Sequence, residues 1–91
     1  MKVKVRLFAP FDADVGKREA VVELRASDLT AALREIAAFL PGLDAHLFTD
    51  GNVTEHVNVF VNGKGVFHEE FAKTRVKDGD EIVLMPPITG G

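Results

Sequence analysis

The sequence of 91 residues contains no cysteine, which excludes disulfide bonds, thiolate metal ligands and a thiol nucleophile. Thioester or persulfide chemistry would therefore need a sulfur atom from a partner. Long hydrophobic runs are also absent: the longest, residues 36–40, is too short to cross a membrane. The first five residues alternate between apolar and polar and lack the apolar core of a signal peptide.

The chain has no excess of basic residues either. Its 11 Lys and Arg and 14 Asp and Glu are interspersed and give a net charge of −3. This charge favours solubility and does not indicate nucleic-acid binding. Hydrophobic residues make up 46% of the sequence, which is typical of a globular protein. We expect one small cytoplasmic domain, without a deep enclosed active site.

Alternating apolar and polar residues indicate several strands. The alternation covers residues 2–7, 20–24 and 57–61, and an apolar run at residues 81–85 predicts the last strand. Val66 and Phe67 are expected to form a further short strand.

A single main helix is predicted between the second and third strands. Ser27 or Asp28 is expected to cap it, apolar residues recur at helical spacing over residues 29–40, and Pro41-Gly42 ends it. The resulting order predicts an α+β fold, with one main helix packed on one face of a mixed sheet of four to five strands.

The remaining segments are expected to be loops or a tail. Residues 10–17 contain turn-forming residues and predict a loop or hairpin turn, and residues 43–55 predict an irregular connection. We expect residues 1–85 to form the domain and residues 86–91 to form a flexible C-terminal tail.

The tail reads Pro86-Pro87-Ile88-Thr89-Gly90-Gly91, and its diglycine suggests a chemical handle. Glycine allows a backbone to approach a partner closely, and no side chain obstructs the α-carboxylate of Gly91. The two prolines fix φ at roughly −65° and stiffen the exit from the last strand. At a glycine usage of about 7%, two terminal glycines arise by chance in roughly 0.5% of chains. Whether the terminal diglycine is functional therefore has to be judged from the rest of the sequence.

Several features together resemble one family. They are the two strands before the helix, Pro41-Gly42-Leu43, Val59-Phe60-Val61-Asn62-Gly63, Asp78-Gly79-Asp80-Glu81 and the tail. The chain resembles a MoaD/ThiS-type sulfur carrier of the β-grasp, ubiquitin-like fold. The Pro-Pro spelling of the tail resembles the small subunit of molybdopterin synthase more than the thiamine-pathway carrier. Archaeal small modifier proteins share these features.

The resemblance implies a sequence of reactions at the tail. A ubiquitin-activating-type adenylating enzyme would use ATP to adenylate the Gly91 carboxylate, with Gly90 keeping the tail thin. Donor sulfur would then give a thiocarboxylate, which the large subunit of molybdopterin synthase uses in molybdenum cofactor biosynthesis. The protein would be a co-substrate that binds no permanent cofactor and is not an enzyme by itself.

Other functions stay open. Gly91 is expected to reach target lysines if the protein is a ubiquitin-like modifier, and the thiocarboxylate would serve thiamine synthesis or tRNA thiolation if the acceptor differs. A plain interaction module with an inert tail is a further alternative. An autonomous enzyme is poorly supported, because titratable residues do not converge in the sequence.

A docking surface is expected beside the tail. If the valines of residues 57–61 point toward the helix, Phe60 points to the other face, and Val83 and Met85 join it there. Exposed apolar patches rich in aromatic residues and methionine are typical of interfaces. The predicted partner-binding residues are Phe60, Val83, Met85, Pro86, Pro87, Ile88 and Thr89.

Other candidate sites are weaker. Lys2, Lys4 and Arg6 form a basic stripe, which is either the solvated side of a strand or a surface that steers an acidic partner. Three histidines and three acidic residues lack the spacing of metal ligands, so no metal site is expected. They are His46, His56, His68, Asp12, Asp14 and Glu19.

Overall fold

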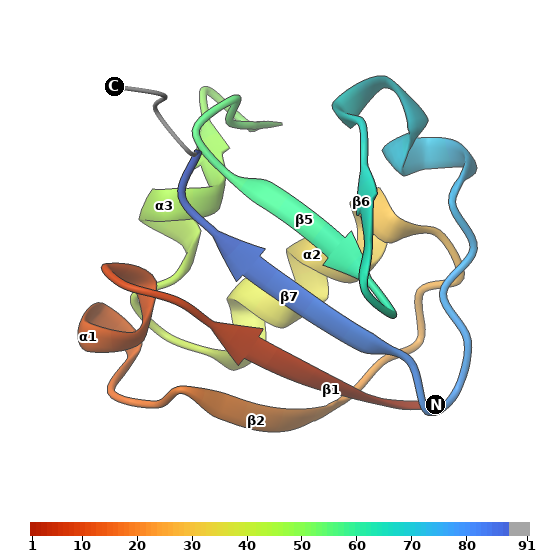
Figure 1. The fold of residues 1–91 in the computed structure, drawn as a ribbon, viewed down its shortest axis with the longest axis horizontal. Helices are drawn as coiled ribbons and strands as arrows, with labels where there is room; N and C mark the ends of the chain where they lie inside the picture. The colour runs from red at the N-terminus through yellow and green to blue at the C-terminus, as the bar shows by residue number, and fades with distance from the viewer. Residues whose placement is uncertain (88–91) are drawn as a thin grey trace.

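A five-stranded mixed sheet with one long helix across one face forms the centre of the molecule (Figure 1). The computed structural model describes residues 1–87, so the predicted tail residues Ile88, Thr89, Gly90 and Gly91 lie outside the described part. The architecture confirms the predicted α+β fold. Within residues 1–87, no helix combines the length and apolar character needed to cross a bilayer.

The strand order is β2-β1-β7-β5-β6, which places the last strand at the centre. The strands are β1 (Lys2–Leu7), β2 (Glu19–Glu23), β5 (Asn58–Val61), β6 (Lys64–Val66) and β7 (Glu81–Met85). Strand β7 runs parallel to β1 and antiparallel to β5, and the two outer pairs are antiparallel. The strand that leads to the tail is therefore hydrogen-bonded on both sides.

Helix α2 (Leu29–Phe39) covers one face of this sheet, and Asp28 is its N-cap. The Asp28 carboxylate accepts a hydrogen bond from the backbone N–H of Ala31 at 3.0 Å, which satisfies one of the free donors of the first turn. The helix buries Leu29, Ala32, Leu33, Ile36 and Ala37. The sheet packs against them with Val3, Val5, Leu7, Val22, Val59, Ile82 and Leu84.

A short helix replaces the loop that we expected at residues 10–17. Helix α1 (Phe11–Val15) is held by Phe11, whose side chain is buried in the core, and ends at Gly16 in the left-handed region. The prediction of a loop or hairpin turn was wrong here, because burial of a single aromatic side chain stabilises a helix of only five residues.

The expected irregular connection at residues 43–55 is also ordered. It contains α3 (Asp44–Leu47) and a hairpin of β3 (Phe48–Thr49) and β4 (Asn52–Val53). Leu43 and Leu47 are fully buried and attach this segment to the core. Gly42 has φ of +98°, and a Cβ there would lie 2.7 Å from the backbone oxygen of Asp14. This close approach lets α1 pack beside the start of α3.

The β5–β6 hairpin shifts the predicted short strand toward the N-terminus. Asn62 and Gly63 both have positive φ, at 51° and 84°, and form a tight turn. Lys64 therefore lies opposite Val61, and β6 begins there rather than at Val66. A 3-10 helix, η1 (His68–Lys73), follows the hairpin and buries Phe71.

A small polar cluster closes the turn before β7. The buried carboxylate of Asp80 accepts hydrogen bonds from the Asn62 side chain at 2.9 Å and from the backbone N–H of Lys77 at 2.7 Å. The Asn62 side-chain oxygen in turn accepts from the backbone N–H of Glu81 at 2.9 Å. These bonds connect the β5–β6 turn to the start of β7.

Candidate functional site

The candidate site begins where β7 leaves the sheet. The strand ends at Met85, and Pro86 and Pro87 follow as half-buried residues. Because proline has no N–H to donate, the two prolines end the ladder. The tail thus starts from the central strand, at the same end of the sheet as the C-terminal end of β1.

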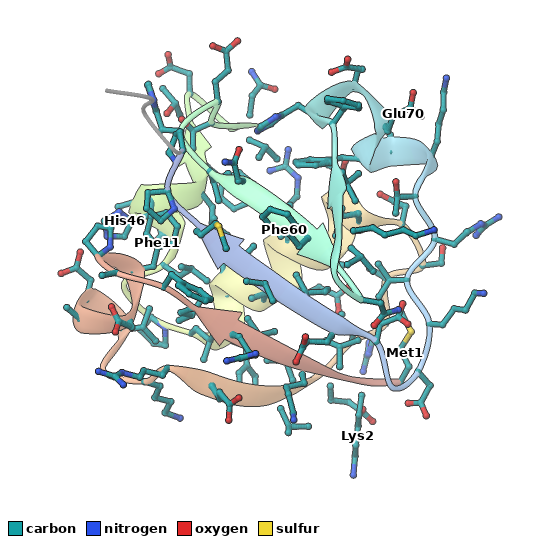
Figure 2. All side chains as sticks on the ribbon, viewed as in Figure 1. Met1, Lys2, Phe11, His46, Phe60 and Glu70 are labelled. Atoms are coloured by element: carbon teal, nitrogen blue, oxygen red, sulfur yellow. The ribbon has the colours of Figure 1, made fainter. Side chains whose placement is uncertain are left out.

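The register places the three predicted docking residues on the face that α2 leaves open. Phe60 lies opposite Val83, and Met85 lies opposite Asn58. Phe60, which is labelled in Figure 2, is half-buried and contributes surface, and Met85 is also half-buried. Val83 is only 8% exposed, so its predicted contribution to an exposed patch was wrong. It lies between Phe60 and Arg6, whose larger side chains leave it little exposed surface.

Two aromatic residues extend this surface and were missed in the sequence. The backbone N–H of Phe8 donates to the Leu84 oxygen at 3.0 Å, which places Phe8 beside the end of β7, and its side chain is 45% exposed. Phe67 follows β6 and is 75% exposed. Continuing the alternation of β1 by one residue would have found Phe8, and pairing the predicted strand at Val66 and Phe67 with the preceding strand would have placed Phe67 on this face. We call Phe8, Phe60, Phe67 and Met85 the open-face patch.

The open-face patch has a hollow at its β6 edge, where Gly65 has no side chain. Gly65 lies opposite Phe60, and a Cβ on it would lie 3.3 Å from Cε2 of the ring. A shallow cavity of about 270 Å³ opens here, between Phe60 and Phe67. The absence of a side chain at Gly65 therefore leaves room for the ring of Phe60 over β6.

Strand β1 contributes charged side chains to the open face. Lys2, Lys4 and Arg6 are exposed on β1, as the alternation predicts. Arg6 forms ion pairs with Glu19 at 3.3 Å and with Glu81 at 3.9 Å. The open face thus has apolar residues beside the tail and charged residues along β1, from Lys2 at the far end to Arg6 close to Phe8.

The three histidines have different surroundings in residues 1–87. His46 pairs with the Asp14 carboxylate and lies 5.0 Å from the ring of Phe11 (Figure 2). The ring Nε2 of His68 lies 3.0 Å from the Thr54 carbonyl oxygen, whereas His56 is exposed. Within residues 1–87, no three His, Asp or Glu side chains converge as metal ligands.

Two relatives that match over their full length come from archaea. The chain is 37% identical over 93 residues to small archaeal modifier protein 3 of Haloferax volcanii, and the match covers 100% of both chains. It is 35% identical to a putative sulfur carrier protein of Archaeoglobus fulgidus, again over 100% of both chains.

Solved structures share the fold. The crystal structure of SAMP1 from Haloferax volcanii matches with a TM-score of 0.85 and 28% identity, covering 100% of each chain. A complex of subunits 1 and 2 of the molybdopterin-converting factor from Helicobacter pylori contains a chain that matches with a TM-score of 0.64 and 30% identity, with 100% of both chains covered.

These matches agree on one architecture and one family. The fold is the ubiquitin-like β-grasp, a mixed sheet with one main helix on one face. Residues 5–91 match the model of the ThiS family, which is nearly the whole chain. The protein therefore belongs to the ThiS family of small sulfur carriers and ubiquitin-like modifiers.

Proposed function

We propose that this protein carries sulfur as a thiocarboxylate on Gly91 and donates it in molybdopterin synthesis, as the small subunit of molybdopterin synthase. One observation carries the proposal. The central strand β7 ends at Met85, a residue of the open-face patch, and the sequence continues from there through Pro86-Pro87 to Ile-Thr-Gly-Gly. A partner that binds the patch would hold the start of the tail at a fixed position, which reduces the freedom of the reacting end.

The proposed chemistry has two stages. A carboxylate oxygen of Gly91 attacks the α-phosphorus of ATP, and the bond to the β-phosphate breaks to release pyrophosphate. A persulfide on a donor protein then attacks the acyl carbon of Gly91 and displaces AMP. A second thiol attacks the resulting acyl disulfide, which leaves the thiocarboxylate on Gly91 and a disulfide between the thiol and the donor.

The sulfur-transfer stage needs a donor protein, because this chain contains no cysteine to hold the sulfur. The adenylating enzyme supplies the nucleotide site, and the donor supplies the persulfide. The role of this protein is to present a thin, unobstructed carboxylate on a stable body. The prolines at the start of the tail limit the directions in which it leaves the sheet.

The proposed sulfur acceptor is a pterin precursor, reached through the large subunit of molybdopterin synthase. Support comes from the Pro-Pro spelling of the tail and from the similarity to a chain of the Helicobacter pylori complex. Thiamine synthesis and tRNA thiolation would use the same thiocarboxylate with a different acceptor. Transfer of sulfur from this protein to the pterin precursor in the presence of the large subunit would therefore test this acceptor.

A second candidate function has its own support. The identity of 37% to small archaeal modifier protein 3 favours a modifier whose Gly91 is joined to target lysines. In that case a lysine Nζ, rather than sulfur, attacks the acyl carbon and displaces AMP, and an isopeptide bond forms. Diglycine remnants on lysines of cellular proteins would support this function.

The first experiment is the intact mass of the protein after incubation with ATP, its adenylating enzyme and a sulfur donor. We expect a mass increase equal to the replacement of one oxygen by sulfur. Deletion of Gly91 should abolish this shift while the melting temperature stays within about 1 °C, because Gly91 is a terminal residue without a side chain to bury. A normal rate of adenylation in the deletion variant would contradict the proposal.

A further inference from the structure

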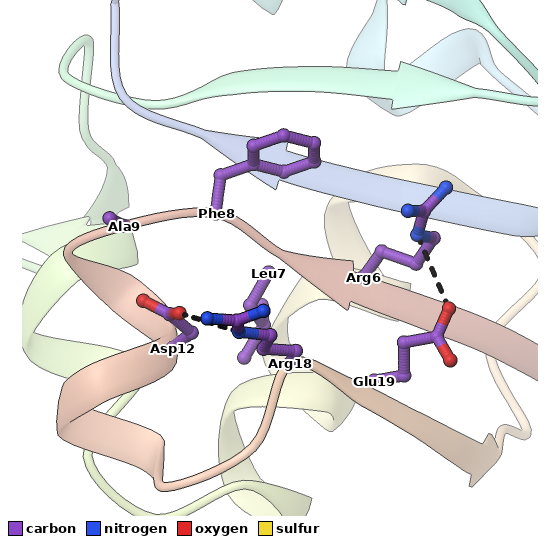
Figure 3. Close-up of a pocket in the computed structure, with 7 residues that line it drawn as sticks. All are labelled: Arg6, Leu7, Phe8, Ala9, Asp12, Arg18 and Glu19. Atoms are coloured by element: carbon purple, nitrogen blue, oxygen red, sulfur yellow. Dashed lines mark ion pairs between the residues drawn. The ribbon is translucent and has the colours of Figure 1, made fainter.

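A shallow cavity of about 390 Å³ lies at the end of β1, next to the open-face patch (Figure 3). Two arginines reach into this region, Arg6 from β1 and Arg18 from the segment before β2. The lining residues are Arg6, Leu7, Phe8, Ala9, Asp12, Arg18 and Glu19. The cavity combines guanidinium groups with the exposed ring of Phe8.

The ion pairs around this cavity are long. Arg18 Nε lies 3.6 Å from the Asp12 carboxylate, and Arg6 contacts Glu19 at 3.3 Å and Glu81 at 3.9 Å. Charge-assisted N–H···O hydrogen bonds are usually about 2.7–2.9 Å long. These contacts therefore leave much of the donor capacity of both guanidinium groups unused.

The two groups of the Arg18 pair differ in their access to solvent. The Arg18 side chain is 88% exposed, whereas the Asp12 side chain is 20% exposed. An approaching molecule therefore meets the cation first. Asp12 and Glu19 hold the guanidinium groups in the cavity, and they make long contacts that an incoming carboxylate can replace.

The cavity is continuous with the surface beside the tail. Phe8 lines the cavity, and its backbone is hydrogen-bonded to β7 one residue before Met85. Figure 3 shows the ring of Phe8 on the side of the cavity that faces β7. A protein that covers the open-face patch would therefore also reach Arg18.

We infer that this cavity binds an acidic side chain of the adenylating enzyme, with Arg18 as its principal contact and Arg6 as the second. This inference rests on the proposed function. A Glu or Asp carboxylate matches the two parallel donors of a guanidinium group, and the Phe8 ring provides apolar contact beside it. The cavity would thus fix the rotational orientation of the carrier, while the open-face patch supplies the apolar contact area.

Titration calorimetry with the adenylating enzyme at low and high salt tests this inference. Arg18→Ala should weaken binding about 10-fold at low salt, because one charge-assisted contact is lost. The ratio of the dissociation constant of Arg18→Ala to that of wild type should decrease as the salt concentration is raised. Arg18→Lys keeps the charge but loses the paired donors, and should fall between wild type and Arg18→Ala.

Arg25→Ala is the matched control. Arg25 is exposed and follows β2 at the opposite end of the sheet, so this substitution removes the same charge away from the cavity. We expect its dissociation constant to stay within about 2-fold of wild type. Equal dissociation constants for Arg18→Ala and Arg25→Ala, whether both weakened or both normal, would overturn the inference.

The proposed function is tested separately by adenylation of the wild-type protein. Adenylation of wild type together with normal binding of Arg18→Ala overturns only the role of the cavity. Failure of the wild-type protein to bind the enzyme or to be adenylated by it overturns both the proposed function and the inference that rests on it. The far-ultraviolet circular dichroism of each variant confirms that the fold is intact.

Discussion

The two faces of the five-stranded sheet differ in what covers them. On the face that packs against α2, Val5, Ile82 and Leu84 are fully buried. On the open face the alternate residues of the same strands include Lys4, Arg6 and Met85, which are exposed or half-buried. Apolar residues therefore have different consequences on the two faces. They hold the fold together on one face and remain available to a partner on the other.

This separation follows from the period of two along a strand. A substitution on one face changes a side chain that does not contact the opposite layer. We therefore expect stability and partner binding to respond to different residues. The following predictions test whether the two faces are independent in this way.

The largest effect is expected on the covered face. Leu33→Ala removes a fully buried side chain of α2 and should lower the free energy of unfolding by about 2–5 kcal/mol, because it leaves a cavity in the core. Urea denaturation measures this loss. Val21→Ala, on the open face where the side chain is 62% exposed, should change stability by less than about 0.5 kcal/mol. Similar losses for both variants would contradict the comparison.

An intermediate effect is expected for binding on the open face. Phe60→Asp places a charge in the open-face patch and should weaken binding to the adenylating enzyme by about 2 kcal/mol or more. Titration calorimetry gives the dissociation constant. Val21→Asp is the matched control, because it introduces the same charge on the same face outside the patch. If Phe60→Asp binds as wild type does, the patch is not part of the interface.

A smaller effect is expected at the polar cluster before β7. Asp80→Ala leaves the Lys77 N–H and the Asn62 side-chain N–H without their acceptor, which should cost about 1–3 kcal/mol of stability. Asp78→Ala, in the same turn but at an exposed position, should cost less. Both are measured by urea denaturation. A greater loss for Asp78→Ala would show that the turn, rather than the buried carboxylate, controls stability.

The regular elements could be predicted from the sequence because their patterns are long. The 11-residue helix α2 has enough turns for its apolar period to stand out, and β1 alternates without interruption. Helices α1 and α3 have five and four residues, which is too short for any period. They are ordered by tertiary burial of Phe11 and Leu47, and that burial depends on contacts far along the chain.

The candidate site could be predicted only in part. Alternation placed Phe60, Val83 and Met85 on one face, and the register confirms this placement. Exposure depends on neighbours in adjacent strands, so the burial of Val83 could not be predicted without the strand order. Phe8 was missed because Pro10 follows β1 closely and ends the pattern early, and Phe67 was missed because a strand predicted from two residues does not show which face each side chain is on. The roles of these residues in partner binding stay predictions.

The position of β7 has a mechanical consequence. If a partner protein pulls on the tail, the force acts along β7 while the rest of this protein is held against that partner. Because β7 is hydrogen-bonded to β1 and β5 on either side, it can slide out only if both ladders break together. Bonds loaded in shear share the force, whereas bonds at a peeled edge break one at a time. The domain can thus resist a force that pulls on β7 from its C-terminal end.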